Sequence, residues 1–433
     1  MALTDMKLVV RSMNARRFST SVTILTVAIA VGLLLTILSI RDSGRASFAR
    51  GSGNMHLLIS RDASPLVAVL NGVFYANAPR NYLMWSDYEE LREKYPLEYS
   101  VPLQLGDSYR GAPIVATTSE YFSEFEPVVD QPWKVETGRF FKRPFEVVVG
   151  AEASEQFNLN LGDRIELTHG IGSQKESDDD HGHHHHHHDE YEYEVVGILS
   201  PTASAHDRAI YSDLTSSWIV HAHDRRQQSN HGHIELTKAD DLIEDDRKIT
   251  GVYARVLTRP NRSASSAIQQ VFSGLRSDPT ITVASPASQI TRLFAIVGSV
   301  DQILIWMAFV VVIASAIAIM LALYNSIEQR RRQIAVLRVL GCSRSRIFSL
   351  VITESAIIGL IGSIIGIAIA VIGTSVVAGV VREQLGINIA IQTWSVWTLI
   401  VGTGTVCLAA AAGFFPAMTA YRTSVVKHLR PLG

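Results

Sequence analysis

Residues 328–366 read EQRRRQIAVLRVLGCSRSRIFSLVITESAIIGLIGSIIG, a basic segment followed at once by an apolar one. Helical spacing in the first half gathers its apolar residues on one side of a helix: Ile334, Val336, Leu337, Val339 and Leu340. Gly341 is typical of a helix end and Ser343 of the start of the next helix. The stretch therefore predicts a helix along a membrane face at about 328–341, followed by a helix that enters the bilayer.

The second half has the length and composition of a spanning helix. From Ile347 to Val381 the only charged residue is Glu354, and about 20 apolar residues suffice to cross a bilayer. Small residues recur four apart, a spacing that lets another helix pack closely: Gly362, Gly366, Ala370, Thr374 and Ala378. We expect this ridge to be a helix-packing surface.

Glu354 lies about two turns into that span. A carboxylate at this depth is costly unless it faces a partner or water, so intramembrane acids are candidate functional residues. Because Glu354 is close to the inner surface, it could instead snorkel or pair with Arg344 or Arg346. Both interpretations stay open.

Three further stretches are long and apolar enough to span a bilayer: 18–40, 303–323 and 393–421. The first has 23 uncharged residues, longer than the roughly 7 to 15 of a signal peptide, and Arg41 and Asp42 make a poor cleavage site, so we expect an uncleaved span. Basic residues crowd the N-terminus, the 330–346 loop and the C-terminal tail. The positive-inside rule places all three in the cytoplasm.

The segment between the first two spans must then lie outside the cytoplasm. It alternates stretches typical of strands and helices, with a mixed α/β part at both ends and a β-rich insert around 146–211. The chain has 433 residues, of which 47% are hydrophobic and 18% charged. We expect a membrane protein with four transmembrane α-helices and a large extracytoplasmic α/β plus β-rich domain between helices 1 and 2. The predicted parts are 1–41, 42–295 and 296–433.

Histidine is the unusual feature of the composition, with DDDHGHHHHHHDE at 178–190. Neutral imidazole suits zinc, copper or nickel, which makes these residues candidate metal ligands: His181, His183, His184, His185, His186, His187 and His188. Three interpretations compete: an engineered tag, a native loop that captures or senses a transition metal such as zinc, and a solvated loop without function. The pairs His221/His223 and His231/His233 would each share one face if they lie on strands.

The run QRRRQIAVLRVLGCSRSRI, the TES that follows and the glycine-spaced helix resemble the signature of FtsX-like permeases of the MacB type, the membrane subunits of mechanotransmission ABC transporters. The ends, RSMNARRFSTSVTILTVAIAVG and FFPAMTAYRTSVVKHLRP, are similar too. The resemblance implies that 328–341 is a coupling helix that docks on a separate cytoplasmic ATPase. The residues it assigns to that contact are Arg330, Arg331, Arg332, Ile334, Leu337, Arg338, Leu340 and Gly341.

No G-x-x-x-x-G-K-[ST] phosphate loop, H-E-x-x-H or G-x-S-x-G motif occurs in the chain, so we expect a non-catalytic subunit whose ATPase is another chain and which itself binds no nucleotide. The basic residues are needed for topology, so a nucleic acid is not an expected partner.

The predicted function is a multi-pass permease of a bacterial inner membrane that couples ATP hydrolysis to work in the periplasm, namely export or extraction of a lipophilic, lipoprotein or peptide substrate. Expected partners are the ATPase, a second copy of the chain, membrane lipid and possible periplasmic adaptors or lipoproteins. The alternatives are a zinc-type efflux component that uses the His-rich loop, and a membrane-anchored sensor with no transport role.

Overall fold

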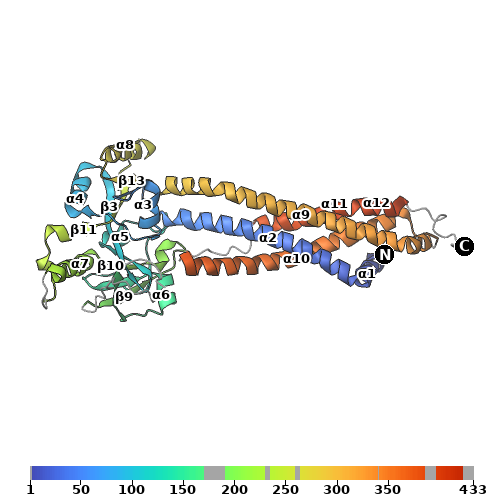
Figure 1. The fold of residues 1–433 in the computed structure, drawn as a ribbon, viewed down its shortest axis with the longest axis horizontal. Helices are drawn as coiled ribbons and strands as arrows, with labels where there is room; N and C mark the ends of the chain where they lie inside the picture. Colours follow the sequence, from blue (N-terminus) through green and yellow to red (C-terminus); the bar gives the residue numbers. More distant parts are fainter. Residues whose placement is uncertain are drawn as a thin grey trace. The chain divides into compact units, whose positions relative to one another are not determined.

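The computed structural model describes residues 2–169, 191–229, 235–258, 264–339, 341–385 and 396–422. These residues form two compact units (Figure 1). The helical unit takes its residues from Met1–Gly44, Val297–Val380 and Ile389–Gly433, and the sheet unit from Arg45–Ile296 with Val381–Asn388. Each unit is described by itself below.

One mixed sheet organises the sheet unit. Among the described residues it has eleven strands, nine of them in the order β13-β1-β12-β3-β4-β10-β6-β9-β5, while β7 pairs with β9 and β8 with β3. Their bounds are β1 Leu57–Ser60, β3 Leu97–Tyr109, β4 Ala112–Thr117, β5 Val135–Gly138, β6 Glu146–Val149, β7 Arg164–Ile165, β8 Thr168–His169, β9 Tyr193–Leu199, β10 Ile210–Asp213, β12 Gly251–Val256 and β13 Thr282–Ala284. Strands β2, Leu83–Met84, and β11, Lys248–Ile249, pair separately.

The two parts predicted for this region are two halves of that single sheet. Strands from both ends of the region, β13, β1, β12, β3 and β4, are consecutive neighbours, and β10, β6, β9 and β5 continue from them. The join is a parallel pairing of β4 with β10, in which Ile114 lies opposite Ile210. The β-rich segment is therefore an extension of the same sheet, because its strand β10 completes the hydrogen bonding of β4.

Short helices lie around the sheet (Figure 1). Their bounds are α3 Pro65–Gly72, α4 Trp85–Lys94, α5 Glu120–Ser123, α6 Ala151–Phe157, α7 Leu214–Ser229 and α8 Ala264–Arg276, with short 3-10 turns η1 Ala205–Arg208, η2 Ala239–Asp241 and η3 Glu244–Asp246. Apolar residues of α3 and α5 join those of the central strands in one aromatic-rich core. Trp218 of α7 and Val271 of α8 belong to a second core with β1 and β12.

The helical unit consists of long apolar helices. Their bounds are α1 Ala2–Ala15, α2 Arg17–Gly51, α9 Pro286–Val339, α10 Arg344–Leu385, α11 Val396–Ala412 and α12 Phe414–Arg422. The end of α2, the start of α9 and the end of α10 belong to the sheet unit. Within the described ranges, four segments are long and apolar enough to span a membrane: Arg17–Ala46, Gln302–Gln329, Arg344–Val380 and Val396–Arg422. The four predicted spans are confirmed. The last of them is broken at Gly413, whose backbone approaches Ser355 of α10 closely.

Two features of the helical unit differ from the sequence prediction. The residues before the first span form a helix of their own, α1, with Val9 and Met13 in the apolar core of the unit. The predicted coupling segment is not a separate helix, because α9 runs without a break to Val339. The predicted stop is found at Gly341, whose φ of 92° suits glycine. α10 then begins at Arg344, with the Arg346 amide donating to Ser343 Oγ at 3.3 Å.

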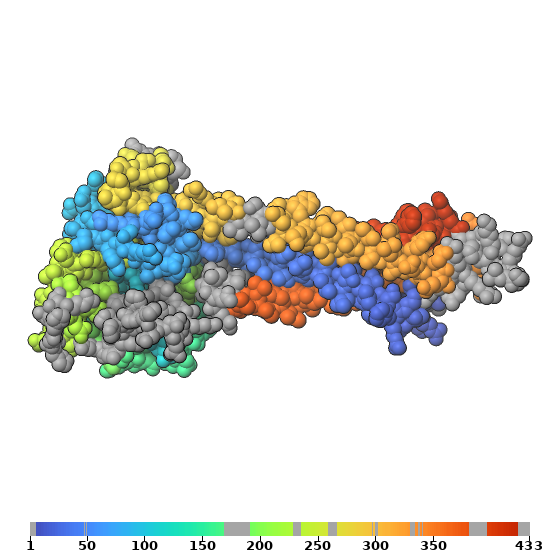
Figure 2. Space-filling model, viewed as in Figure 1, coloured from blue at the N-terminus to red at the C-terminus, as the bar shows by residue number. Residues whose placement is uncertain are grey.

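Helix α9 also presents large apolar side chains to the outside of the unit. They are Trp306, Met307, Phe309, Val310, Ile313 and Ile317. Figure 2 shows the surfaces of α2, in blue, and α9, in orange, meeting along one face of the helical unit, and Ser315 Oγ of α9 donates to the Thr26 carbonyl of α2 at 3.4 Å. The side chains exposed on α9 are of the type that faces lipid in a membrane.

Candidate functional site

An ion pair joins Arg16, the residue between α1 and α2, to Glu354 of α10. Arg16 Nη2 lies 2.5 Å from Glu354 Oε1, and Ser12 Oγ of α1 donates to the two carboxylate oxygens at 3.2 and 3.1 Å. Both charged side chains are largely buried, with 16% and 11% of their surface exposed. The carboxylate thus has a cation and a hydroxyl donor, as a charge at this depth requires.

This arrangement corrects one predicted alternative for Glu354. Pairing with Arg344 does not occur, since Arg344 lies over the ring of Tyr421, 5.9 Å from its centre. Sequence reasoning missed Arg16 as the partner because it lies 338 residues away and was considered only as a topology signal.

A cavity of about 380 Å³ opens beside the ion pair. α1 contributes Val9 and Ser12, α9 contributes Ile327 and Ile334, and α10 contributes Leu350 and Glu354. The walls are mainly aliphatic. The end of α9 and the carboxylate of α10 therefore share one cavity.

The apolar residues predicted to share one side of the coupling segment lie on different sides of α9. Ile334 and Ala335 pack inward, whereas Val336 and Val339 are exposed. At 3.6 residues per turn, positions 334 and 336 point in nearly opposite directions, so the prediction of one shared side was wrong. Arg330, Arg331, Arg332, Leu337 and Arg338 lie on α9, and Arg338 is half-buried. Leu340 lies outside the described residues.

The predicted small-residue ridge of α10 packs against α2 of the same chain. A methyl group on Gly362 would lie 2.6 Å from Val27 Cγ1, and one on Gly366 would lie 2.7 Å from Val31 Cβ. Ala370, next on the ridge, is buried in the same apolar core. Because the ridge is occupied within the chain, it gives no support for a dimer, and α2 and α10 form one closely packed pair.

In the sheet unit, His206 forms a hydrogen bond with the last turn of α2. Its Nε2 lies 3.0 Å from the Gly51 carbonyl and its Nδ1 lies 2.8 Å from Tyr75 Oη. The ring is fully buried among aromatic side chains that include Phe125 and Trp133. Burial lowers the pKa of His206 to about 4, the Gly51 carbonyl opposes this shift, and the charge of Arg208 adds to it. The imidazole is therefore neutral at pH 7, with Nε2 donating to Gly51 and Tyr75 donating to Nδ1.

Aromatic contacts join the same turn of α2 to the start of α9 within the sheet unit. The ring centre of Phe48 lies 4.6 Å from that of Phe74 and 5.6 Å from that of Phe294, and the Arg45 guanidinium lies 5.6 Å from the Phe294 ring centre. Sequence reasoning did not single out any of these residues. Only the isolated position of His206, away from the His-rich run, could have pointed to it.

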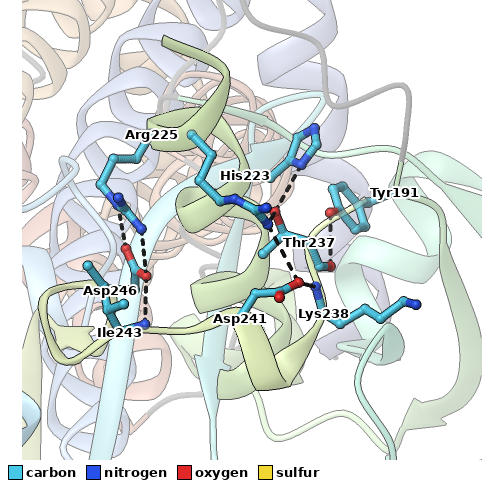
Figure 3. A network of polar contacts seen from close by, with 9 residues as sticks. Tyr191, His223, Arg225, Thr237, Lys238, Asp241, Ile243 and Asp246 are labelled. Atoms are coloured by element: carbon cyan, nitrogen blue, oxygen red, sulfur yellow. Dashed lines mark hydrogen bonds and ion pairs between the residues drawn. The ribbon is translucent and has the colours of Figure 1, made fainter. Parts of the chain in front are cut away.

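His221 and His223 do not lie on a strand, since both belong to α7. Two residues apart on a helix, they point to different sides. His223 is buried, and its Nδ1 lies 3.1 Å from Thr237 Oγ1 in the polar network of Figure 3. His221 instead has Nε2 at 3.6 Å from Asp107 Oδ1.

The candidate metal ligands of the His-rich run, residues 181 and 183–188, lie outside the described residues, as do His231 and His233. Within the described ranges, no group of three or more His, Cys, Asp or Glu side chains could hold a metal ion. The two cysteines, Cys342 and Cys407, belong to the helical unit and are free thiols.

Comparison with known families agrees with this architecture. A sequence model of the MacB-like periplasmic core domain matches residues 20–272, more than half of the chain, and one of the FtsX-like permease C-terminal region matches residues 305–425. The chain belongs to the FtsX-like permeases of the MacB type. The permease thus carries a periplasmic-type domain between its first and second spanning helices, as the resemblance implied.

Two relatives are ABC transporter permeases by name, both uncharacterized. The one from Methanocaldococcus jannaschii is 23% identical over 168 residues, 38% of this permease and 42% of its own length. The one from Mycobacterium tuberculosis is 25% identical over 301 residues, 68% of this permease and 30% of its own length. The permease therefore matches less than half of the length of either relative.

Among solved structures, the extracellular domain of the noncanonic ABC-type transporter YknZ from Gram-positive bacteria is similar at 11% identity with a TM-score of 0.26. The match covers 53% of this permease and 98% of that chain. Because the TM-score is this low, the similarity does not support the family assignment. That assignment depends on the two sequence models.

Proposed function

We propose that this permease is the membrane subunit of an ABC transporter in a bacterial inner membrane. ATP would be hydrolysed on a separate cytoplasmic ATPase, and the permease would convert that event into movement of its sheet unit in the periplasm. Membership of the MacB-type permeases supports the class, and the absence of a phosphate loop from the sequence supports a separate ATPase.

The observation that carries the proposal is a series of contacts from the end of α9 to the start of α2. Ile334 and Glu354 line one cavity, Glu354 binds Arg16, and α2 begins at Arg17. The packing of Gly366 against Val31 extends the contact of α10 with α2. A displacement of the end of α9 would therefore be transmitted to α2 through closely packed side chains.

The exposed apolar residues at the end of α9 suit a docking role. Val336 and Val339 are exposed and flank Arg338. The core of a protein–protein interface is more apolar than the rest of the surface, and arginine is enriched in it. The family to which the chain belongs supports the ATPase as the occupant, with Arg330, Arg331 and Arg332 as further contacts.

The work would be done on a lipophilic molecule, a lipoprotein or a peptide held at the sheet unit, by a pair of permeases with two ATPases. Four spans with few charged residues favour the transmission of movement across the membrane over the formation of an aqueous channel. A periplasmic adaptor or lipoprotein would be a further partner.

Association with the ATPase tests the proposal directly. Replacing Leu337 with Asp and Arg338 with Glu should abolish copurification of the ATPase and its stimulated ATP turnover. Arg422→Glu, which repeats the arginine-to-glutamate change on an exposed residue of α12, should leave both unchanged. An intact and active complex with the double variant would contradict the proposal. Failure of any ATPase to copurify with the wild-type permease would favour the sensor alternative.

Thiol labelling tests the topology. Cys342 and Cys407 are the only cysteines of the chain, so a permease with both replaced by serine and with Glu136→Cys on exposed strand β5 has one thiol in the sheet unit. A membrane-impermeant maleimide should label it in cells with a permeable outer envelope. Labelling only after the inner membrane is broken would place the sheet unit in the cytoplasm and end the proposal.

A further inference from the structure

Two neighbouring cavities lie at one end of the helical unit. The first is the cavity of about 380 Å³ beside the Arg16–Glu354 pair, and the second, of about 430 Å³, lies between the start of α2 and α9. Ala15 and Ser326 line both cavities, so the two are adjacent. Each has a volume within the range of about 300–1,000 Å³ that is usual for small-molecule sites.

The two cavities differ in chemistry. Aliphatic side chains from α1, α9 and α10 form most of the first, among them Leu8, Val9, Ile327, Ile334, Leu350 and Val351. The second is lined by basic and polar residues together with one aromatic residue, namely Arg16, Arg17, Phe18, Asn325 and Gln329. An apolar cavity beside a basic one suits a molecule that has both an acyl chain and an anionic head.

The charges around the cavities favour an anion. Glu354 and Arg16 form an ion pair and so offset each other. Arg11 lines the first cavity and Arg17 the second, and both side chains are exposed. Among the described residues that line the two cavities, Glu354 is the only acid. The lining therefore carries an excess of two positive charges.

The ends of three spanning segments place both cavities at a surface of the bilayer. Arg17–Ala46 and Arg344–Val380 begin there, and Gln302–Gln329 ends there. Leu8 and Phe18, which line the first and the second cavity, have 46% and 82% of their surface exposed. The positive-inside rule makes this the cytoplasmic surface, where anionic phospholipids give the leaflet a negative potential.

We propose that the two cavities together bind one anionic phospholipid of the cytoplasmic leaflet. Arg11 and Arg17 would bind its phosphate, and one of its acyl chains would occupy the aliphatic cavity. Arg11 is one helical turn before Ala15 and thus on the same face of α1, next to the residue that the two cavities share.

The bound lipid would contact α1, α9 and α10 at once. Because Ile334 lies near the end of α9 that is proposed to meet the ATPase, the lipid would also stabilise the contacts that transmit movement. ATP turnover of the assembled complex in vesicles should therefore rise with the fraction of anionic lipid. This last expectation rests on the proposed function, whereas the binding of the lipid does not.

Lipid binding to the full-length permease, purified in a neutral detergent without any ATPase, tests the proposal. Native mass spectrometry counts the lipids that stay bound when dioleoyl phosphatidylglycerol or dioleoyl phosphatidylcholine is added at increasing ratios. We expect one phosphatidylglycerol per chain to be retained at ratios at which phosphatidylcholine is lost. Excess inorganic phosphate should not displace it, because the acyl chain contributes to binding.

Two kinds of variant test the two cavities. Arg11→Gln/Arg17→Gln should weaken phosphatidylglycerol binding roughly thirtyfold, since each basic residue near anionic lipid contributes about a factor of five. Ala15→Phe should abolish binding, because Ala15 is exposed and lines both cavities. The added ring would fill space there without replacing a residue of the core.

Matched controls accompany these variants. Arg422→Gln on α12 and Val10→Phe on α1, both at exposed positions that line neither cavity, should leave binding unchanged. The thermal midpoint of each variant without added lipid shows whether it is folded, and Ala15→Leu takes the place of an Ala15→Phe protein that does not fold. Equal retention of the two lipids, displacement by phosphate, or unchanged binding in the variants of both cavities would overturn the proposal.

Discussion

Glu354 of α10 and Arg16, the residue before α2, form an ion pair with 2.5 Å between Oε1 and Nη2. Two chain segments 338 residues apart in sequence are thereby joined at the cytoplasmic end predicted for the helical unit. The contact gives the proposed transmission of force a definite first step, and it can be tested residue by residue.

Glu354→Gln should lower the stability of the permease and weaken coupling. Removing one partner of a buried ion pair leaves the other charge uncompensated, at a cost of about 3 kcal/mol. We expect a lower thermal midpoint in detergent and reduced ATP turnover of the assembled complex. The double variant Arg16→Gln/Glu354→Gln should recover most of the stability, and Glu93→Gln at an exposed position of α4 should have little effect. A double variant no more stable than Glu354→Gln would show that the pair is not the cause.

Gly366→Leu should disrupt the packing of α10 against α2. Even a methyl group at Gly366 would lie 2.7 Å from Val31 Cβ and 2.8 Å from the Ala28 carbonyl oxygen, and overpacking of this kind costs about 1–3 kcal/mol. Gly379→Leu on the same helix is the matched control, because nothing lies within 4 Å of a methyl group there. We expect a lower thermal midpoint and lost ATPase coupling for the first variant alone. Equal behaviour of the two variants would contradict close α2–α10 packing.

The stability of the sheet unit should depend on His206 below pH 6.5. The folded pKa of about 4 lies below the ordinary value of 6.5, so the unfolded chain takes up the proton first. The contribution of neutral His206 is complete above pH 6.5 and declines until pH 4, by about 3 kcal/mol in total. His206→Gln should therefore flatten the fall of the thermal midpoint between these two pH values. An unchanged slope would mean that other groups determine the acid sensitivity.

Deletion of residues 178–190 separates metal binding from metal transport. If the cargo is not a metal, cells with the deleted permease should keep wild-type zinc tolerance, and the ATP turnover of the complex should be unchanged. Growth at graded zinc concentrations is the measurement. Zinc sensitivity equal to that of cells without the permease would favour the efflux alternative over the proposed function.

The sequence predicted what depends on local pattern and length. Four spans, the turn at Gly341 and most strands of the sheet unit follow from runs of apolar residues and from glycine chemistry, and the structure contains them. The two-residue spacing of His221 and His223 would place both on one face of a strand, but these residues lie on a helix. The continuous helix α7 overrode that local pattern, because its apolar residues Trp218, Ile219 and Val220 pack on the sheet.

Contacts between segments that are distant in the chain could not be predicted from the sequence. Nothing near Arg16 indicates that it binds Glu354, and nothing near His206 indicates that it holds Gly51, since each contact needs the fold to bring two segments together. The α1 helix was missed for a related reason. Its apolar residues Val9 and Met13 were too few for a span, and their contacts with the spanning helices account for the helix.

The glycine face of α10 is already filled by α2, and this restricts how a second copy could join. A second copy would need to pack against other outward-facing side chains of the helical unit, such as Trp306 and Phe309 of α9 or Ile372 and Val376 of α10. These side chains are larger than glycine, so they would keep the backbones of two permeases further apart than those of α2 and α10.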